Sequence, residues 1–218
     1  MPFDESERPG PERGAGQRAI NLPPVLLWLI GINVAIQLVR EFLGDATDGD
    51  IIQQFGLVPA AYTSGAGPDL LSLLAAPITY QFLHGGWLHL GINMVTLAAF
   101  GVPVVRVLGA RRFILFYLSA GIFAGFVHVF FFPDSMDPVV GASGAISGVF
   151  GGVLILMRYV GSLPSLLPVA GVWIALNVFF GIFGGTPGAG GESVAWVAHI
   201  AGFLFGMASI RFFAPRMS

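Results

Sequence analysis

Residues 139–158 read VVGASGAISGVFGGVLILMR, an apolar run with a serine, Ser143, near its start and glycines repeated every fourth position. Its core, Ala142–Met157, has the apolarity of a membrane-crossing helix but is shorter than most, and it ends beside Arg158. Small residues spaced four apart let two membrane helices approach closely. The stretch therefore predicts a short membrane helix with a serine hydroxyl close to one end.

The whole chain has the composition of an integral membrane protein. Of its 218 residues, 55% are hydrophobic and 10% are charged, and the mean hydropathy is +0.81, which lies outside the globular range. Apolar runs near the ~20 residues that a crossing helix needs predict six spans in an all-α membrane protein. The predicted spans are Pro23–Val39, Ile78–Val105, Phe113–Phe132, Ala142–Met157, Leu163–Phe183 and Val194–Phe213.

Composition also narrows the classes of function. The absence of cysteine excludes disulfides, thiol catalysis and zinc–thiolate sites, and a formal charge of -2 gives no reason to expect nucleic acid as a partner. Residues 1–21 mix acidic residues, arginines, prolines and glycines, so we expect a flexible cytoplasmic tail without a secretory signal. Residues 22–218 then form one membrane domain.

Arginines mark one side of the membrane. They lie before span one, between spans two and three, after span four and at the end of span six: Arg8, Arg13, Arg18, Arg106, Arg111, Arg112, Arg158, Arg211 and Arg216. Cytoplasmic segments of membrane proteins carry an excess of Lys and Arg. We therefore expect a protein of the bacterial inner (plasma) membrane with both termini in the cytoplasm; Arg40 is the one arginine that does not fit this pattern. The long connection Gly44–Pro77 has apolar segments of its own and is predicted to lie on or dip into the bilayer interface.

Four polar side chains from three spans are predicted at a similar depth. Counting back at about 1.5 Å per residue from the arginine that ends each span, Ser143 lies roughly 22 Å from the cytoplasmic side, His199 about 18 Å, Asn93 about 20 Å and His89 about 25 Å. The hydrocarbon core is about 30 Å thick, so all four lie below the outer surface. The spacing of His89 and Asn93 puts both on one helix face.

Glycine stripes predict which of these spans touch. Span four and span six each carry such a stripe: Gly144, Gly148 and Gly152 in the first, and Gly202 and Gly206 in the second. Close packing of the two spans would bring the His199 imidazole next to the Ser143 hydroxyl. A base must lie within hydrogen-bond distance of a serine to activate it. Since no carboxylate lies at this depth, the prediction is a Ser–His dyad. The Ser143 backbone N–H, the Asn93 amide and the His89 imidazole are candidate donors to an oxyanion.

Three separated motifs resemble those of the rhomboid intramembrane serine proteases. They are Gly141–Gly144, Ala198–Gly202 with Gly206, and His84–Asn93, supported by Phe55–Tyr62 and Gly109–Tyr117. The resemblance covers nearly the whole chain after Asn21 and implies a six-transmembrane-helix rhomboid fold. It implies that Ser143 is the nucleophile, His199 the general base, and His89 and Asn93 oxyanion-assisting residues.

The resemblance also implies a substrate class. It implies cleavage of single-span or other transmembrane proteins, within or near their membrane segments, in contact with membrane lipid and without a metal or cofactor. One departure concerns Ser147, which stands where many relatives carry an aromatic residue that supports the histidine ring. A second is the absence, in the first loop, of the Trp–Arg pair that many relatives carry there.

The remaining polar residues receive structural interpretations. His128 reaches the same depth, about 24 Å, but lies outside the matched motifs. His84 is placed at or outside the outer interface, and its spacing of five from His89 puts the two rings on different helix faces. The amides predicted to make helix–helix hydrogen bonds are Asn33, Gln37 and Asn177.

Two other functions compete with proteolysis. A non-catalytic rhomboid-like protein that binds transmembrane clients is the first, although such proteins often lack the serine or the histidine. A transporter or metal site built on the four histidines is the second. Against it stand the absence of intramembrane carboxylates and of an H-E-x-x-H motif.

Overall fold

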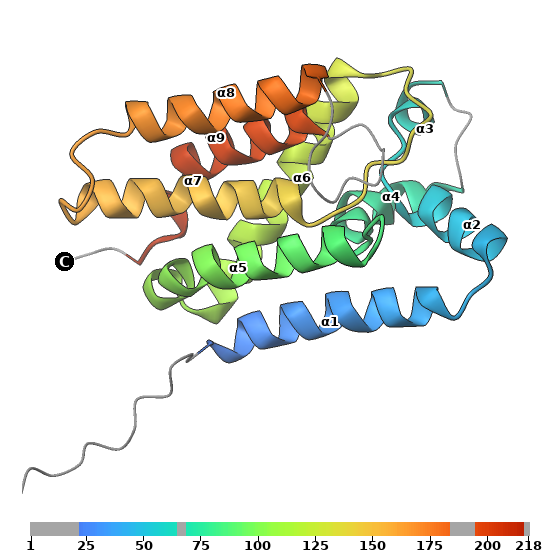
Figure 1. Ribbon diagram of the computed structural model, residues 1–218, viewed down its shortest axis with the longest axis horizontal. Helices are drawn as coiled ribbons and strands as arrows, with labels where there is room; N and C mark the ends of the chain where they lie inside the picture. The colour runs from blue at the N-terminus through green and yellow to red at the C-terminus, as the bar shows by residue number, and fades with distance from the viewer. Residues whose placement is uncertain (1–21, 65–68, 184–194, 216–218) are drawn as a thin grey trace, which may run out of the picture.

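The computed structural model describes residues 22–64, 69–183 and 195–215, so the predicted tail at 1–21 lies outside the described residues. These residues form helices joined by short turns, and the one β-type pairing among them is an isolated bridge between Leu57 and Val139. In chain order (Figure 1), the helices are α1 (Pro24–Glu41), α2 (Asp45–Phe55), α3 (Pro59–Thr63), α4 (Leu70–Thr79), the 3₁₀ turn η2 (Tyr80–Phe82), α5 (Trp87–Leu108), α6 (Ala110–Phe131), α7 (Ser143–Tyr159), α8 (Leu167–Phe183) and α9 (Trp196–Phe213).

Four of the described helices are long and apolar enough to cross a membrane, namely α1, α5, α6 and α9. Two further apolar helices, α7 and α8, have 17 residues each. The chain is therefore a multi-pass membrane protein with an all-helical fold, and the expected total of six crossings stays a prediction.

The predicted second span was wrong at its start. Instead of one helix from Ile78, the chain ends α4 at Thr79, makes the turn η2, and begins α5 at Trp87. The break lies at residues 83–86, where Leu83 is extended, with φ -91° and ψ 146°, and Gly86 has a φ of 149°, which no helical residue adopts. Hydropathy averaged along the chain does not register four non-helical residues between two apolar segments.

The long connection between α1 and α5 is mostly helical. Asp69 begins α4 by accepting hydrogen bonds from the backbone N–H groups of Leu71 (2.9 Å) and Ser72 (3.2 Å). The bonds from Ser72 hold the pKa of the Asp69 carboxyl below its usual value. Beyond this cap, α4 leaves Leu71 and Leu74 exposed, as a segment at the bilayer interface would.

Arg40, the exception in the charge pattern, is a buried structural cation. Its guanidinium binds Asp48 through two contacts, Nε to Oδ1 at 2.7 Å and Nη2 to Oδ2 at 3.0 Å. Its third nitrogen, Nη1, donates to the His84 carbonyl at 2.7 Å and to Gln37 Oε1 at 3.2 Å. The charge is therefore paired inside the protein.

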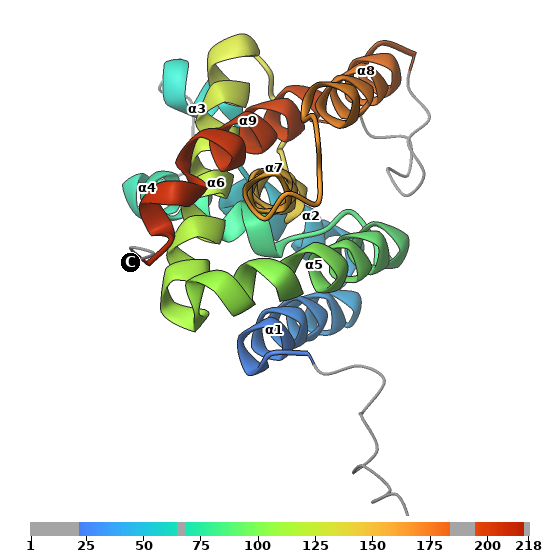
Figure 2. The ribbon, with the colours of Figure 1, turned by 90° about the vertical axis from the view of Figure 1, so that its left-hand side faces the viewer.

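The central helix is α7, around which α5, α6, α8 and α9 are arranged when the molecule is viewed along it (Figure 2). The predicted packing of α7 on α9 is confirmed by its glycines. A Cβ atom added to Gly202 would overlap the carbonyl oxygen of Gly144, and one added to Gly206 would overlap that of Gly148. The two backbones are thus in direct contact, an approach that only residues without a Cβ allow.

Candidate active site

The structure brings Ser143 and His199 into hydrogen-bond contact. Ser143 is the first residue of α7 and His199 lies in the first turn of α9. The distance from His199 Nε2 to Ser143 Oγ is 2.7 Å. This is within the range that a base needs to accept a serine proton. It depends on the contact between Gly202, one turn after His199, and Gly144, the residue that follows Ser143.

The segment before Ser143 is held in place from two sides. Val139 exchanges backbone hydrogen bonds with Leu57 at 2.9 and 3.0 Å, and the Gly141 N–H donates to the Tyr80 carbonyl at 2.9 Å. Gly141 itself has a φ of 122°, a conformation that favours glycine. This turn ends the extended segment and allows α7 to start at Ser143.

Starting a helix at Ser143 has an electrostatic consequence. The first N–H groups of an α-helix have no carbonyl one turn earlier, so the Ser143 N–H points out of the helix start with the positive end of the helix dipole. In α7 the bond from the Ile146 N–H to the Ala142 carbonyl is the first of the helical series. A negative charge that develops beside Ser143 would meet these donors.

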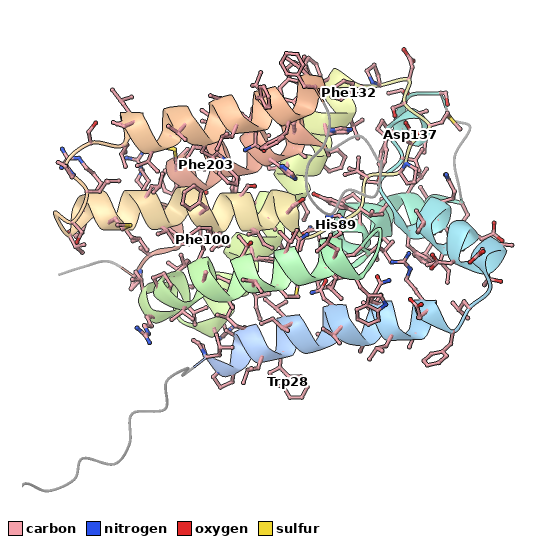
Figure 3. The ribbon with its side chains drawn as sticks, viewed as in Figure 1. Trp28, His89, Phe100, Phe132, Asp137 and Phe203 are labelled. Atoms are coloured by element: carbon pink, nitrogen blue, oxygen red, sulfur yellow. The ribbon has the colours of Figure 1, made fainter. Side chains whose placement is uncertain are left out.

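His89 lies beside the same point. In Figure 3 it lies between α5 and the start of α7. A Cβ atom placed on Gly141 would be 2.9 Å from His89 Nε2 and 3.6 Å from Ser143 Oγ. The Gly85 N–H donates to His89 Nδ1 at 3.3 Å, which leaves the proton of a neutral ring on Nε2 and makes Nε2 a donor toward this point.

Asn93 is buried one turn below His89. Its amide Nδ2 donates to the His89 carbonyl at 2.9 Å, and this side chain forms no hydrogen bond with Ser143 or His199 in the described part of the chain. Of the four predicted site residues, His199 bonds to Ser143, His89 lies beside Gly141 next to Ser143, and Asn93 bonds to the His89 carbonyl. The roles of all four in catalysis stay predictions.

The predicted separation of the His84 and His89 rings was wrong, and the depth of His84 in the membrane stays a prediction. His84 is buried, in the segment before α5 rather than on that helix, and its ring packs against His89 with centroids 5.1 Å apart. Burial, with a smaller effect of His89, lowers the pKa of His84 to about 3, so the ring is neutral at pH 7. Its Nε2 lies 3.4 Å from the Ala142 N–H, which ties the ring to the turn before Ser143.

The three span amides have different outcomes. The predicted helix–helix bond of Asn177 is confirmed, and its partner is His199, with Oδ1 2.9 Å from Nδ1. The same prediction is wrong for Asn33 and Gln37, which bond within α1 to Leu29 and Arg40. The signal that singled out Asn177 was its position as a lone amide in an apolar span; its partner could not be read from the sequence.

The other residues at this depth make separate contacts. The His128 ring packs on Phe132 with centroids 4.8 Å apart, and Ser147 is buried within α7. A metal site would need several ligands close together, and within residues 22–64, 69–183 and 195–215 no group of three or more His, Asp or Glu side chains has that arrangement.

Long apolar helices around a buried α7, with a serine–histidine contact at its start, define a multi-pass helical membrane protein with a candidate nucleophilic site. A sequence profile of the Rhomboid domain matches residues 74–216, which include every residue of that site. The chain therefore belongs to the rhomboid family.

Curated relatives come from distant organisms. "Rhomboid protein 1, mitochondrial" of Saccharomyces cerevisiae is 31% identical over 194 residues, covering 82% of this chain and 50% of that protein. "Rhomboid protease GluP" of Bacillus subtilis is 35% identical over 135 residues, covering 62% and 25%. "Rhomboid-related protein 3" of Homo sapiens is 36% identical over 118 residues, covering 52% and 29%. The chain thus spans a quarter to a half of the length of these relatives.

Proposed function

We propose that this protein is an intramembrane serine endopeptidase that cleaves transmembrane proteins with a Ser143–His199 dyad. The observation that carries the proposal is the 2.7 Å contact between His199 Nε2 and Ser143 Oγ at the start of an apolar helix. Membership of the rhomboid family, which includes relatives named as proteases, supports the same activity. The substrates are single-span or other membrane proteins, as the resemblance implies.

The reaction follows from the geometry of the dyad. His199 Nε2 accepts the hydroxyl proton while Ser143 Oγ attacks the carbonyl carbon of the scissile peptide. The oxyanion that forms accepts hydrogen bonds from the Ser143 N–H and from His89 Nε2, and it is assisted by Asn93, whose Nδ2 also bonds to the His89 carbonyl. His199 then gives the proton to the leaving amine, and the acyl-enzyme forms. In the second half of the reaction, His199 takes a proton from a water molecule, the water oxygen attacks the acyl carbon, and His199 returns the proton to Ser143 Oγ as the acid product leaves.

Six crossings and cytoplasmic termini in a bacterial inner membrane complete the proposal. Helices α7 and α8 have 17 residues each, about 26 Å at 1.5 Å per residue, close to a hydrocarbon core of about 30 Å. Because the chain has no cysteine, single cysteines at the exposed positions Ser162 and Asp137 test the topology. The proposal expects Asp137→Cys to be labelled by an impermeant reagent from outside, and Ser162→Cys to be labelled only after permeabilisation.

Activity is tested with a single-span reporter protein in liposomes. Ser143→Ala and His199→Ala are expected to abolish cleavage while each variant keeps the wild-type unfolding midpoint. Fluorophosphonate labelling of Ser143 in the wild type measures activation of the hydroxyl without a protein substrate. Cleavage that survives in either variant would remove the dyad from the mechanism.

A further inference from the structure

The proposed dyad leaves one question, which is how the His199 ring is held, because Ser147, one turn after Ser143 on α7, has no ring that could support it. We propose that Asn177 of α8 is the positioning residue of His199, fixing both the orientation of the ring and the nitrogen that carries its proton. The proposal rests on the proposed function of Ser143 and His199 and adds a third element, α8, to the site.

The hydrogen bonds around Asn177 leave one self-consistent arrangement. The backbone carbonyl of Trp173 lies 2.9 Å from Asn177 Nδ2, and a carbonyl can only accept. The NH₂ group therefore faces Trp173, and the other end of the amide, Oδ1, faces His199 Nδ1 at 2.9 Å. An amide oxygen also only accepts, so the proton of a neutral imidazole must be on Nδ1.

This assignment decides what the other ring nitrogen can do. With the proton on Nδ1, Nε2 of His199 presents a lone pair, and the Ser143 hydroxyl 2.7 Å away must be the donor. That is the protonation state a general base needs before it takes the serine proton. In the opposite tautomer, Nε2–H would face the hydroxyl as a donor, and the serine could not be deprotonated by this ring.

The burial pattern of α8 supports a functional reason for the amide. This helix is apolar apart from Asn177, and its buried residues are Ala170 and Asn177. It leaves Leu176, Phe179 and Ile182 exposed and turns its amide inward, toward His199. Burying an amide costs free energy unless both its ends find partners, and here the donor end and the acceptor end are both bonded.

The contacts of α8 locate the amide on a braced part of the helix. Phe203 lies between α7 and α8 in Figure 3, where its ring packs on Trp173 with centroids 6.2 Å apart and on Phe150 with centroids 5.7 Å apart. Trp173 is also the residue whose carbonyl orients Asn177. The orientation of His199 is thereby linked to the docking of α8 on α7 and α9.

A matched pair of isosteric variants tests the proposal. Asn177→Leu keeps the shape of the side chain and removes the acceptor, whereas Asn177→Asp keeps an oxygen at the same position whether or not the carboxyl is ionised. The control is Asn33→Leu, since Asn33 makes the same bond to a carbonyl one turn earlier, 2.8 Å to Leu29, but lies on α1 away from the site. Each variant is assayed in detergent and in liposomes for kcat, KM and the rate of fluorophosphonate labelling.

We expect Asn177→Leu to lower kcat and the labelling rate together by at least about tenfold, with KM changed by less than about twofold, because only the state of the base is altered. Asn177→Asp should recover most of both rates, and Asn33→Leu should match the wild type. Equal rates for Asn177→Leu and the wild type would overturn the proposal, as would an Asn177→Asp variant as slow as Asn177→Leu. The small labelling reagent separates a defect in the base from a defect in substrate docking.

A measurement on the unaltered protein covers the case in which Asn177→Leu does not fold. Nitrogen-15 NMR of labelled histidines, with His199 assigned by His199→Ala, reports which ring nitrogen is protonated. The proposal requires the proton on Nδ1, and a His199 signal with the proton on Nε2 would refute it. Failure of Ser143 to label in the wild type would instead refute the proposed function, so the two failures are distinct.

Discussion

The contact between Gly202 and Gly144 makes a quantitative prediction for Gly202→Ala. A Cβ atom at position 202 would overlap the Gly144 carbonyl oxygen and would lie 3.0 Å from the carbonyl carbon. Both are backbone atoms that cannot rotate away, so α9 and α7 must separate by about 1 Å to restore an ordinary contact distance. His199 lies one turn before Gly202 and moves with it.

The separation acts directly on the dyad. Adding about 1 Å to the 2.7 Å distance between His199 Nε2 and Ser143 Oγ takes it past about 3.5 Å, where the hydrogen bond is lost. We expect kcat to fall about 100-fold, the usual consequence of a misplacement of this size. The free energy of unfolding should fall by about 1 to 3 kcal/mol, as in other overpacked cores.

The assay compares reporter cleavage, fluorophosphonate labelling and unfolding midpoint for Gly202→Ala and for a matched control, Gly171→Ala. A Cβ atom at Gly171 on α8 meets nothing within 4 Å, so the control adds the same methyl group in a membrane helix without a collision. The control should keep wild-type activity. Cleavage by Gly202→Ala at the wild-type rate, at a temperature where it is folded, would refute the claim that the glycine contact sets the dyad distance.

Three further predictions concern the residues around the site. Asp48→Ala leaves the buried Arg40 guanidinium without its carboxylate and should lower the free energy of unfolding by about 1 to 3 kcal/mol, measured by denaturation in mixed micelles; an unchanged midpoint would contradict it. Burial lowers the pKa of His84 to about 3. In the unfolded chain His84 is protonated below its ordinary pKa of about 6.5, whereas in the folded protein it stays neutral down to about pH 3. The free energy of unfolding should therefore fall as the pH decreases from about 6.5 toward 3, by at most about 1.4 kcal/mol per pH unit. His84→Gln should remove that part of the pH dependence, and identical pH profiles for the variant and the wild type would contradict the prediction. Gly141→Ala places a Cβ atom 2.9 Å from His89 Nε2 on a residue whose φ is 122°, a conformation that favours glycine. Fluorophosphonate labelling of Ser143 should therefore slow by more than about tenfold, and a wild-type labelling rate would contradict a requirement for glycine at this turn.

Much of the helical framework follows from local features of the sequence. Apolar length located α1, α6, α7 and α9 to within a few residues, because a helix in lipid must satisfy its own backbone and needs a minimum number of apolar residues. The start of α5 was missed because a short non-helical segment, from the extended Leu83 to Gly86 with its φ of 149°, interrupts a run that is apolar on average.

The part of the candidate site that was predictable is the part that depends on glycine spacing along single helices. Glycines at every fourth position identify the faces of α7 and α9 that can touch, and this places His199 at Ser143. The predicted separation of His84 from His89 failed for the opposite reason. It treated both residues as parts of one straight helix, whereas His84 lies before α5 begins at Trp87 and its ring contacts that of His89.

The sequence by itself determined that the chain crosses the membrane several times, that α7 and α9 pack through glycines, and that Ser143 and His199 form the pair at this contact. These features depend on hydropathy and on spacings of three and four residues, which are local properties of one helix. Tertiary structure decided that Asn177 bonds to His199, that His84 accepts from the Ala142 N–H, and that Arg40 is paired with Asp48 inside the protein. Each of these contacts joins residues whose distance in space is set by how the helices and turns pack, and a lone polar residue in a sequence carries no record of its partner.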